Sequence, residues 1–203
     1  MAPNATPPET AMTALILGLV IFLGVHSVRL VADDWRTGVR ARVGENAYKG
    51  LYSLLSIAGF ALIVWGYGLA RQQPVVLWLP PLWTRHLAAL LTLPSFVLLA
   101  AAYVAGNSLK TRLRHPMVLG IKLWAAAHLL ANGNLADVLL FGSFLVWAAL
   151  SFRAARARDR AAGAVAAPGR LGPTLVAVAV GLAAWAVFAF WAHGVLIGVR
   201  PFG

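Results

Sequence analysis

The sequence predicts an all-α membrane protein, a polytopic bundle of six antiparallel transmembrane helices. Hydrophobic residues make up 61% of the chain and charged residues 11%, whereas a soluble domain carries about 45–50% apolar and about 25% charged residues. The apolar residues are gathered into runs long enough to cross a hydrocarbon core of about 30 Å as helices. We therefore expect membrane lipid to surround this chain.

Six apolar runs follow one another along the chain. We expect spans at residues 11–32, 51–70, 83–105, 117–131, 135–152 and 172–197. The fourth and fifth runs are short and a tight turn separates them, which predicts an antiparallel hairpin. The connections, such as residues 33–49 and the one that holds Lys110, are expected to be basic loops.

A few residues mark where these helices begin, bend and end. Pro116 precedes the fourth span, in the first-turn position that suits proline. Asn132 and Gly133 follow that span, and both tolerate the left-handed backbone of a helix terminus. Pro94 lies inside the third span and predicts a kink there, because proline removes a backbone hydrogen bond.

The chain is expected to have four parts. The Pro-rich polar tail of residues 1–10 is expected to be disordered, and residues 11–152 are expected to form a five-helix core. Residues 153–171 are interpreted as a basic cytoplasmic linker, and residues 172–203 as the sixth transmembrane helix and the C terminus. No clear small-residue cleavage site follows the first apolar run, so we expect it to be retained as a span.

Basic residues collect in the connections after the first, third and fifth spans. They are Arg36, Arg40, Arg42, Lys49, Lys110, Arg112, Arg114, Arg153, Arg156, Arg158, Arg160 and Arg170. The other side has only Arg71, Arg85 and Arg200. The positive-inside rule then predicts a multi-pass protein of a bacterial inner membrane with both termini in the periplasm. The net charge of +11 is spread over short tracts between apolar runs, so we expect anionic lipid, and no nucleic acid, beside them.

The sequence contains no cysteine, which excludes disulfides, thiolate metal sites, iron–sulfur clusters and covalent haem attachment. Any metal or haem must then be bound by histidine, methionine, tyrosine or carboxylates. The chain also lacks a Gly-rich phosphate loop, a His-Glu-x-x-His motif and a Gly-x-Ser-x-Gly motif.

His26 and His128 are the principal candidate metal ligands. Ionisable groups at membrane depth are expensive, so they are functional candidates by default. The two histidines lie at similar expected depth on different helices beside small residues, which suits a flat cofactor such as haem b. Trp124 and Asn132 flank His128 at four residues on either side and are candidate cofactor contacts. The alternative is that each histidine is structural and bonds to a neighbouring helix.

The remaining ionisable residues near these spans have several interpretations. Arg29, or Arg112 and Arg114, would bind haem propionates as charge-assisted pairs. His115 and Lys122 are seven residues apart and share a face that points roughly 140° from His128, so one helix cannot present both histidines to one metal.

Both His115 and Lys122 are candidate catalytic groups, with plainer alternatives. His115 is otherwise a cap or interfacial residue. Lys122 either snorkels to the cytoplasmic surface or faces the interior and neutralises a carboxylate. His86 and His193 are expected near the outer surface as interfacial residues, with pairing to each other or to Asp137 as the alternative. Asp137 most simply caps the fifth helix.

Four stretches carry a resemblance to a known family. They are FLGVHSVRL at 22–30, GENAYKGLYSLLSIAGFALIVWGYG at 44–68, RHPMVLGIKLWAAAHLLANG at 114–133 and DVLLFGSFLVWA at 137–148. Together they cover most of residues 13–152 and resemble the NnrU family, which is named for association with nitrite and nitric oxide reduction. That family is similar to 15-cis-zeta-carotene isomerase, a membrane protein that uses haem b with histidine-held iron.

The resemblance implies roles for particular residues of this chain. The histidine of the isomerase's first-helix motif falls on His26, and its downstream histidine falls on His128. The intervening motif falls on His115 and Pro116. The chain departs from the isomerase in its shorter N terminus and in carrying Lys122 within the fourth span, so the resemblance supports haem binding better than any substrate.

Three functions are therefore expected as alternatives. The first is a membrane haem b protein with a redox- or nitric-oxide-linked role in denitrification, whose iron would meet nitric oxide. The second is a haem-dependent cis–trans isomerase of a polyene, which would need an apolar groove at the iron. The third is a non-enzymatic assembly partner of a membrane nitric oxide reductase.

Overall fold

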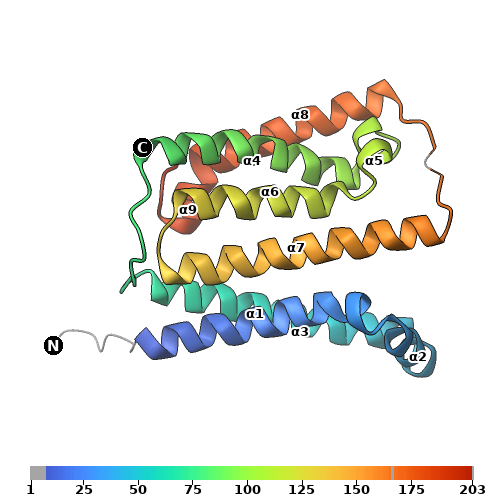
Figure 1. Ribbon diagram of the computed structural model, residues 1–203, viewed down its shortest axis with the longest axis horizontal. Coiled ribbons are helices and arrows are strands. Elements are labelled where there is room, and N and C mark those ends of the chain that lie inside the picture. The colour runs from blue at the N-terminus through green and yellow to red at the C-terminus, as the bar shows by residue number, and fades with distance from the viewer. Residues whose placement is uncertain (1–7, 166, 203) are drawn as a thin grey trace. The chain divides into compact units, whose positions relative to one another are not determined.

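The computed structural model describes residues 8–165 and 167–202 and shows an all-helical protein (Figure 1). The helices are α1 (Pro8–Val31), α2 (Asp33–Val43), α3 (Glu45–Ala70), α4 (Leu82–Tyr103), α5 (Ser108–Leu113), α6 (Pro116–Ala131), α7 (Leu135–Ala161) and α8 (Leu171–Val187). A π-helical turn, η1 (Phe188–Ala192), and α9 (His193–Ile197) continue α8 without a break.

Five of these segments are long and apolar enough to cross a membrane, so the chain is a polytopic membrane protein. They are Glu9–Val31, Glu45–Ala70, Leu82–Tyr103, Leu135–Ala161 and Leu171–Ile197. The prediction of an all-α polytopic fold is confirmed. The expected fourth span is α6, an apolar helix of 16 residues whose length of about 24 Å falls short of the ~30 Å hydrocarbon core.

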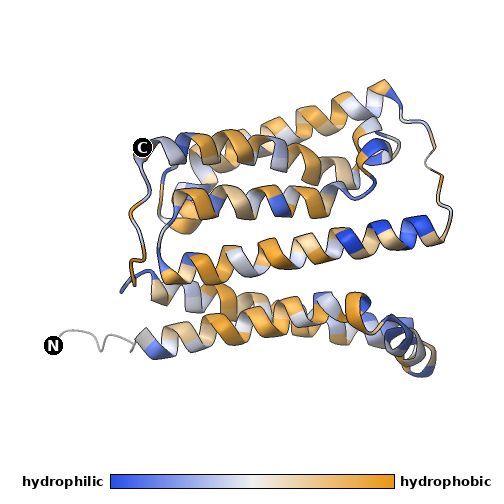
Figure 2. Ribbon diagram, viewed as in Figure 1, coloured by the Kyte–Doolittle hydropathy of each residue, from blue (hydrophilic) through white to orange (hydrophobic). Residues whose placement is uncertain are grey.

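Large apolar side chains are exposed on the surface of every long helix. Examples are Val20, Leu54, Leu90, Val146 and Phe190, each more than half exposed. Figure 2 shows hydrophobic residues along these helices and hydrophilic residues at the C-terminal end of α7 and in α2. Such apolar surface is typical of a protein surrounded by lipid.

Several segments that were expected to be loop or tail are helical. Residues 1–7 of the expected disordered tail lie outside the described residues, whereas residues 8–10 form the first turn of α1. Residues 33–43 form α2, with Asp33 in its first turn and Arg42 in its last. These charges complement the helix dipole, so the basic composition of the connection does not prevent a helix. The connection around Lys110 likewise contains α5.

The helix of the fifth span does not end at Phe152 as expected, because α7 continues to Ala161 and is not short. Its last turns contain the arginines that were expected in the linker: Arg153, Arg156, Arg158 and Arg160. Alanine and arginine are among the strongest helix formers, so loss of hydrophobicity does not end the helix. Gly163, with a φ of 56°, follows the helix and takes the left-handed conformation that terminates such segments.

The prediction for the two ends of α6 is correct at the N-terminal end only. Pro116 occupies the first turn, as predicted. The helix also ends before Asn132, but the backbone of Asn132 is extended, with φ −132° and ψ 138°, and Gly133 has no positive φ. The predicted left-handed terminus is therefore wrong. Instead, the Asn132 side chain donates to the carbonyl of His128 at 2.8 Å, which satisfies one of the terminal carbonyls.

The contacts divide the chain into two compact units. Unit 1 comprises Met1–Trp78 and Asn134–Ser143, and unit 2 comprises Leu79–Gly133 and Phe144–Gly203. Helix α7 therefore begins in unit 1 and ends in unit 2. Unit 1 is built on the packing of α1 against α3, and unit 2 on the packing of α4 against α6 and α8.

Glycines allow α1 and α3 to approach closely in unit 1. A Cβ atom at Gly59 would lie 2.8 Å from the backbone nitrogen of Phe22, and one at Gly66 would collide with the backbone of Leu15. Gly18 faces the backbone of α3 in the same way, with a would-be Cβ contact of 2.6 Å. Small residues of this kind are enriched where membrane helices touch, because packing rather than water exclusion drives their association.

Unit 2 joins its helices by close packing and by polar contacts. The buried Ser95 hydroxyl donates to the carbonyl of Gly120 at 2.7 Å, which links α4 to α6. On the other side of α4, Gly181 of α8 lies against the backbone of Val97. The Trp185 indole donates to the Thr92 hydroxyl at 3.1 Å.

Replacing Gly66 by alanine is expected to destabilise the protein by about 1–3 kcal/mol, because the added methyl group overpacks a backbone contact that cannot yield. Gly68→Ala is the matched control, since a Cβ there meets nothing within 4 Å and alanine favours a helix by up to about 1 kcal/mol. Thermal unfolding in detergent measures both variants. Equal stability of the two would contradict the glycine contact.

Candidate functional site

His26 lies in α1, and a backbone carbonyl determines which of its ring nitrogens carries the proton. Its Nδ1 is 2.6 Å from the carbonyl oxygen of Phe22. Because a carbonyl only accepts, Nδ1 donates, and the lone pair of the neutral ring is on Nε2. The imidazole stacks on the Phe22 ring at 4.3 Å and lies 5.2 Å from the ring of Tyr52 in α3.

His128 in α6 has the same local arrangement. Its Nδ1 is 2.9 Å from the carbonyl oxygen of Trp124, so the lone pair of its neutral ring is again on Nε2. The Trp124 ring is 5.1 Å from the imidazole and packs edge-on against Phe144 at 5.6 Å. Metal-ligating histidines usually donate their second ring nitrogen in this way, which fixes ring orientation and tautomer.

Each candidate ligand belongs to its own unit, His26 to unit 1 and His128 to unit 2. Among the described residues there is no group of three or more His, Cys, Asp or Glu side chains that could hold a metal ion. Each unit thus contains one histidine whose Nδ1 donates to a carbonyl, and histidine is a residue that binds haem iron.

His115 binds a carboxylate and caps no helix. Its Nε2 lies 3.0 Å from Oδ2 of Asp159 in α7, and its ring meets Phe152 edge-on at 6.2 Å. Although it immediately precedes α6, its side chain makes no capping hydrogen bond. Arg114 reaches the same Asp159 oxygen at 3.4 Å. Two adjacent residues of the Arg-His-Pro motif thus fasten the start of α6 to the end of α7.

Arg114 has a backbone conformation that L residues rarely adopt. Its φ is 64°, the only positive value at a non-glycine residue in the part of the chain that the structure describes. Such a conformation costs of order 1–3 kcal/mol and persists only where surrounding contacts require it. The ion pair with Asp159 is one such contact, and it engages the guanidinium that was a candidate propionate ligand.

The other predicted polar residues are exposed. Lys122 lies on an exposed face of α6, which favours snorkelling over neutralisation of an interior carboxylate. Arg29 in α1 and Arg112 in α5 are also exposed. Asn132 contacts the carbonyl of His128 and forms part of the helix end.

The two outer histidines, both in unit 2, have separate surroundings. His86 is exposed on α4. His193 Nδ1 donates to the carbonyl of Val199 at 2.6 Å, and its ring meets Phe188 at 5.7 Å. The carbonyl contact ties the end of the last span to the segment that follows it.

The sequence did not predict the buried hydrogen-bond network around Asp137. This residue is only 2% exposed. One carboxylate oxygen accepts from the Tyr67 hydroxyl at 2.6 Å. The other accepts from the backbone and side-chain nitrogens of Asn134 at 3.2 and 2.8 Å. The predicted capping role of Asp137 at the start of α7 is confirmed. Its pairing with Tyr67, 70 residues away, had no local signal.

The comparison with known families now adds to this geometry. Residues 14–201 match the family model described as NnrU protein. The chain belongs to the NnrU family. Comparisons with curated proteins and with solved structures found no match.

The family match extends beyond the stretches that carry the resemblance in the sequence. It covers both compact units of this NnrU-family protein, including the arginine-rich end of α7 and the last apolar span. The links from α6 to α7 and from Tyr67 to Asp137 therefore lie within the family fold.

Removing the Tyr67 hydroxyl by Tyr67→Phe is expected to destabilise the protein by about 1–3 kcal/mol, because a buried carboxylate oxygen loses its donor. Tyr103→Phe is the matched control, since Tyr103 is 78% exposed. Thermal unfolding in detergent compares the two variants. A Tyr67→Phe protein as stable as the control would show that the hydroxyl contributes nothing.

Proposed function

We propose that this NnrU-family protein binds one haem b, which His26 and His128 would hold. The observation that supports the proposal is the bond from Nδ1 of each ring to the carbonyl four residues earlier. This arrangement fixes the proton of the neutral ring on Nδ1 and places its lone pair on Nε2, the atom that would bind a metal. Histidine is a usual axial ligand of haem iron.

The residues around each histidine suit a flat aromatic cofactor. Phe22 and Tyr52 pack against the His26 ring, and Trp124 packs against the His128 ring. These aromatic rings pack against the imidazoles and restrict their orientation. The exposed guanidinium groups of Arg29 and Arg112 are of the kind that binds propionates by charge-assisted hydrogen bonds.

The role we propose is redox- or nitric-oxide-linked, within denitrification, as the family resemblance implies. Bound haem would supply one-electron chemistry, and it would accept a gaseous ligand once one of the two histidines had left the iron. The protein's own part is to orient the two imidazoles through the carbonyls of Phe22 and Trp124. Because His115 is engaged with Asp159, its part in this proposal is to position α6, the helix that carries His128.

We also propose that α6 crosses the membrane with the five longer segments, which gives six spans with both termini in the periplasm. The support is the distribution of charge. Connections after the first, third and fifth spans contain twelve of the 17 Lys and Arg residues, whereas those on the other side contain three. This bias orients helices by the positive-inside rule. A 16-residue helix spans a bilayer that thins locally around it.

Replacement of His26 or His128 by alanine is expected to abolish or shift the haem absorption of the purified protein, because each change removes one axial nitrogen. Optical spectra of oxidised and dithionite-reduced protein, expressed with ample haem, provide the measurement. The unmodified protein should show a Soret band and the sharp reduced bands of six-coordinate iron.

His86→Ala is the matched control, since this exposed histidine should leave the spectrum unchanged. Unchanged spectra in both the His26 and His128 variants would remove the ligand assignment. Absence of a Soret band would contradict haem binding as a whole. A non-enzymatic role as the assembly partner of a reductase would then be the better hypothesis.

The proposed orientation predicts opposite labelling of two single cysteines, which the cysteine-free chain makes simple to introduce. Leu79→Cys, at a site that is 85% exposed, should react with a membrane-impermeant maleimide in intact cells. Val165→Cys, at a site that is 93% exposed, should react only after the membrane is opened. The reverse pattern would invert the topology.

A further inference from the structure

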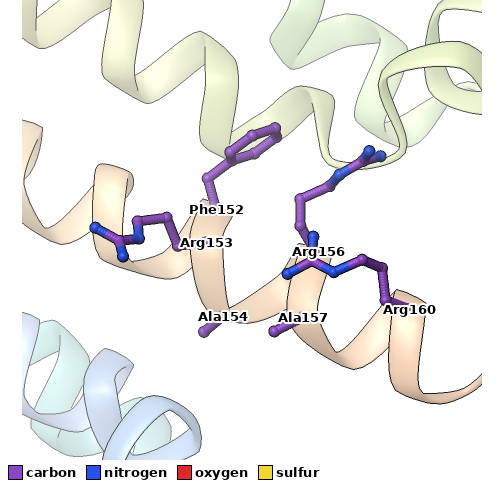
Figure 3. Close-up of a pocket in the computed structure, with 6 residues that line it drawn as sticks. All are labelled: Phe152, Arg153, Ala154, Arg156, Ala157 and Arg160. Carbon is purple, nitrogen blue, oxygen red and sulfur yellow. The ribbon is translucent and has the colours of Figure 1, made fainter.

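The C-terminal end of α7 contains a hollow that the proposed haem site does not use. Its volume is about 520 Å³, within the range of roughly 300–1,000 Å³ that is typical of ligand pockets. The lining residues all come from α7: Phe152, Arg153, Ala154, Arg156, Ala157 and Arg160. Figure 3 shows the long side chains among them leaving the helix from successive turns.

The position of this hollow along α7 corresponds to the edge of the membrane. Residues 135–152 form the apolar part of the helix and rise about 27 Å at ~1.5 Å per residue. That length nearly crosses a hydrocarbon core of about 30 Å. The hollow begins at Phe152, where the apolar part ends, and extends toward Arg160. It therefore lies at the level of the lipid headgroups.

Within their own compact unit, the arginines of the hollow have little negative charge near them. Residues 79–133 and 144–203 contain a single acidic residue, Asp159. That carboxylate is already bound by His115 at 3.0 Å and Arg114 at 3.4 Å. Within residues 8–165 and 167–202, the three lining arginines form no ion pair. Their guanidinium groups are thus available to an anion from outside the chain.

We propose that this hollow binds the phosphate headgroup of one anionic phospholipid. Arginine presents paired N–H donors in a planar fork that matches a phosphate. The small side chains of Ala154 and Ala157 leave room for the headgroup between the arginines. Phe152 gives an apolar wall on the membrane side, where the glycerol and the first acyl carbons would lie.

His115, the residue before α6, packs against Phe152 and holds this apolar wall in place. Phe152 meets the His115 ring edge-on at 6.2 Å, and His115 is bound to Asp159 in the last turn of α7. A lipid bound here would therefore stabilise the same helix end that the Arg-His-Pro motif fastens. The inference rests on charge and depth, and it holds whether or not the protein binds haem.

Native mass spectrometry of the full chain in neutral detergent tests the proposal. The protein is titrated with phosphatidylglycerol, with phosphatidylcholine of the same acyl chains, and with inorganic phosphate. One phosphatidylglycerol molecule is expected to bind in preference to phosphatidylcholine. Each guanidinium near a membrane surface contributes enough to change binding about fivefold, so Arg156→Gln with Arg160→Gln should weaken binding about 25-fold.

The matched control is Arg158→Gln with Arg42→Gln, which removes the same charge away from the hollow. Arg158 points from the opposite side of α7, about 200° from Arg156, and Arg42 is exposed in α2. This control should bind phosphatidylglycerol as the unmodified protein does. Arg156→Lys with Arg160→Lys keeps the charge but loses the paired donors, so its affinity should fall between those of the unmodified protein and the glutamine pair.

Three outcomes would overturn the proposal. If the unmodified protein binds phosphatidylcholine as tightly as phosphatidylglycerol, the hollow does not recognise the charge of the headgroup. This comparison needs no variant. If the Arg156/Arg160 variant and the control variant weaken lipid binding equally, the lipid responds to the overall positive charge of the protein surface and not to the hollow. Binding of inorganic phosphate with no preference for the anionic lipid would assign the hollow to a soluble phosphate.

Discussion

The structure depends on a constraint that the bilayer imposes, namely that apolar helices must associate without water to drive them together. Close approach of backbones replaces the hydrophobic effect in this setting. Gly18, Gly59 and Gly66 provide it between α1 and α3, and Gly181 provides it between α4 and α8. At each of these positions a methyl group would meet backbone atoms rather than movable side-chain ends, so the packing tolerates little change.

Polar groups are few in this chain, and the two best-placed carboxylates each fasten segments that are distant in sequence. Asp137 joins the start of α7 to Tyr67 in α3, and Asp159 joins its end to the His115–Arg114 pair before α6. In a low-dielectric environment such paired groups are strong, and an unpaired one is costly. Helix α7 is therefore fixed at both ends by carboxylates, one in each compact unit.

The proposed cofactor site and the proposed lipid site rest on different physical features of the same fold. The first depends on two imidazoles whose tautomer is set by the backbone carbonyls of Phe22 and Trp124. The second depends on cations that the chain itself does not neutralise, at the end of α7. His115 contributes to both sites, because it positions α6 through Asp159 and also packs against Phe152.

The sequence by itself determined the all-α membrane class and the approximate spans, because hydrophobic run length and charge placement are local properties. It also predicted the helix start at Pro116 and the capping role of Asp137. It did not predict that α7 continues to Ala161, because polarity was taken as a loop signal although alanine and arginine favour helix. Only the tertiary structure decided the partners of Asp137 and Asp159. Those bonds join residues 70 and 44 positions apart, and no local pattern encodes which distant side chain will pair with a carboxylate.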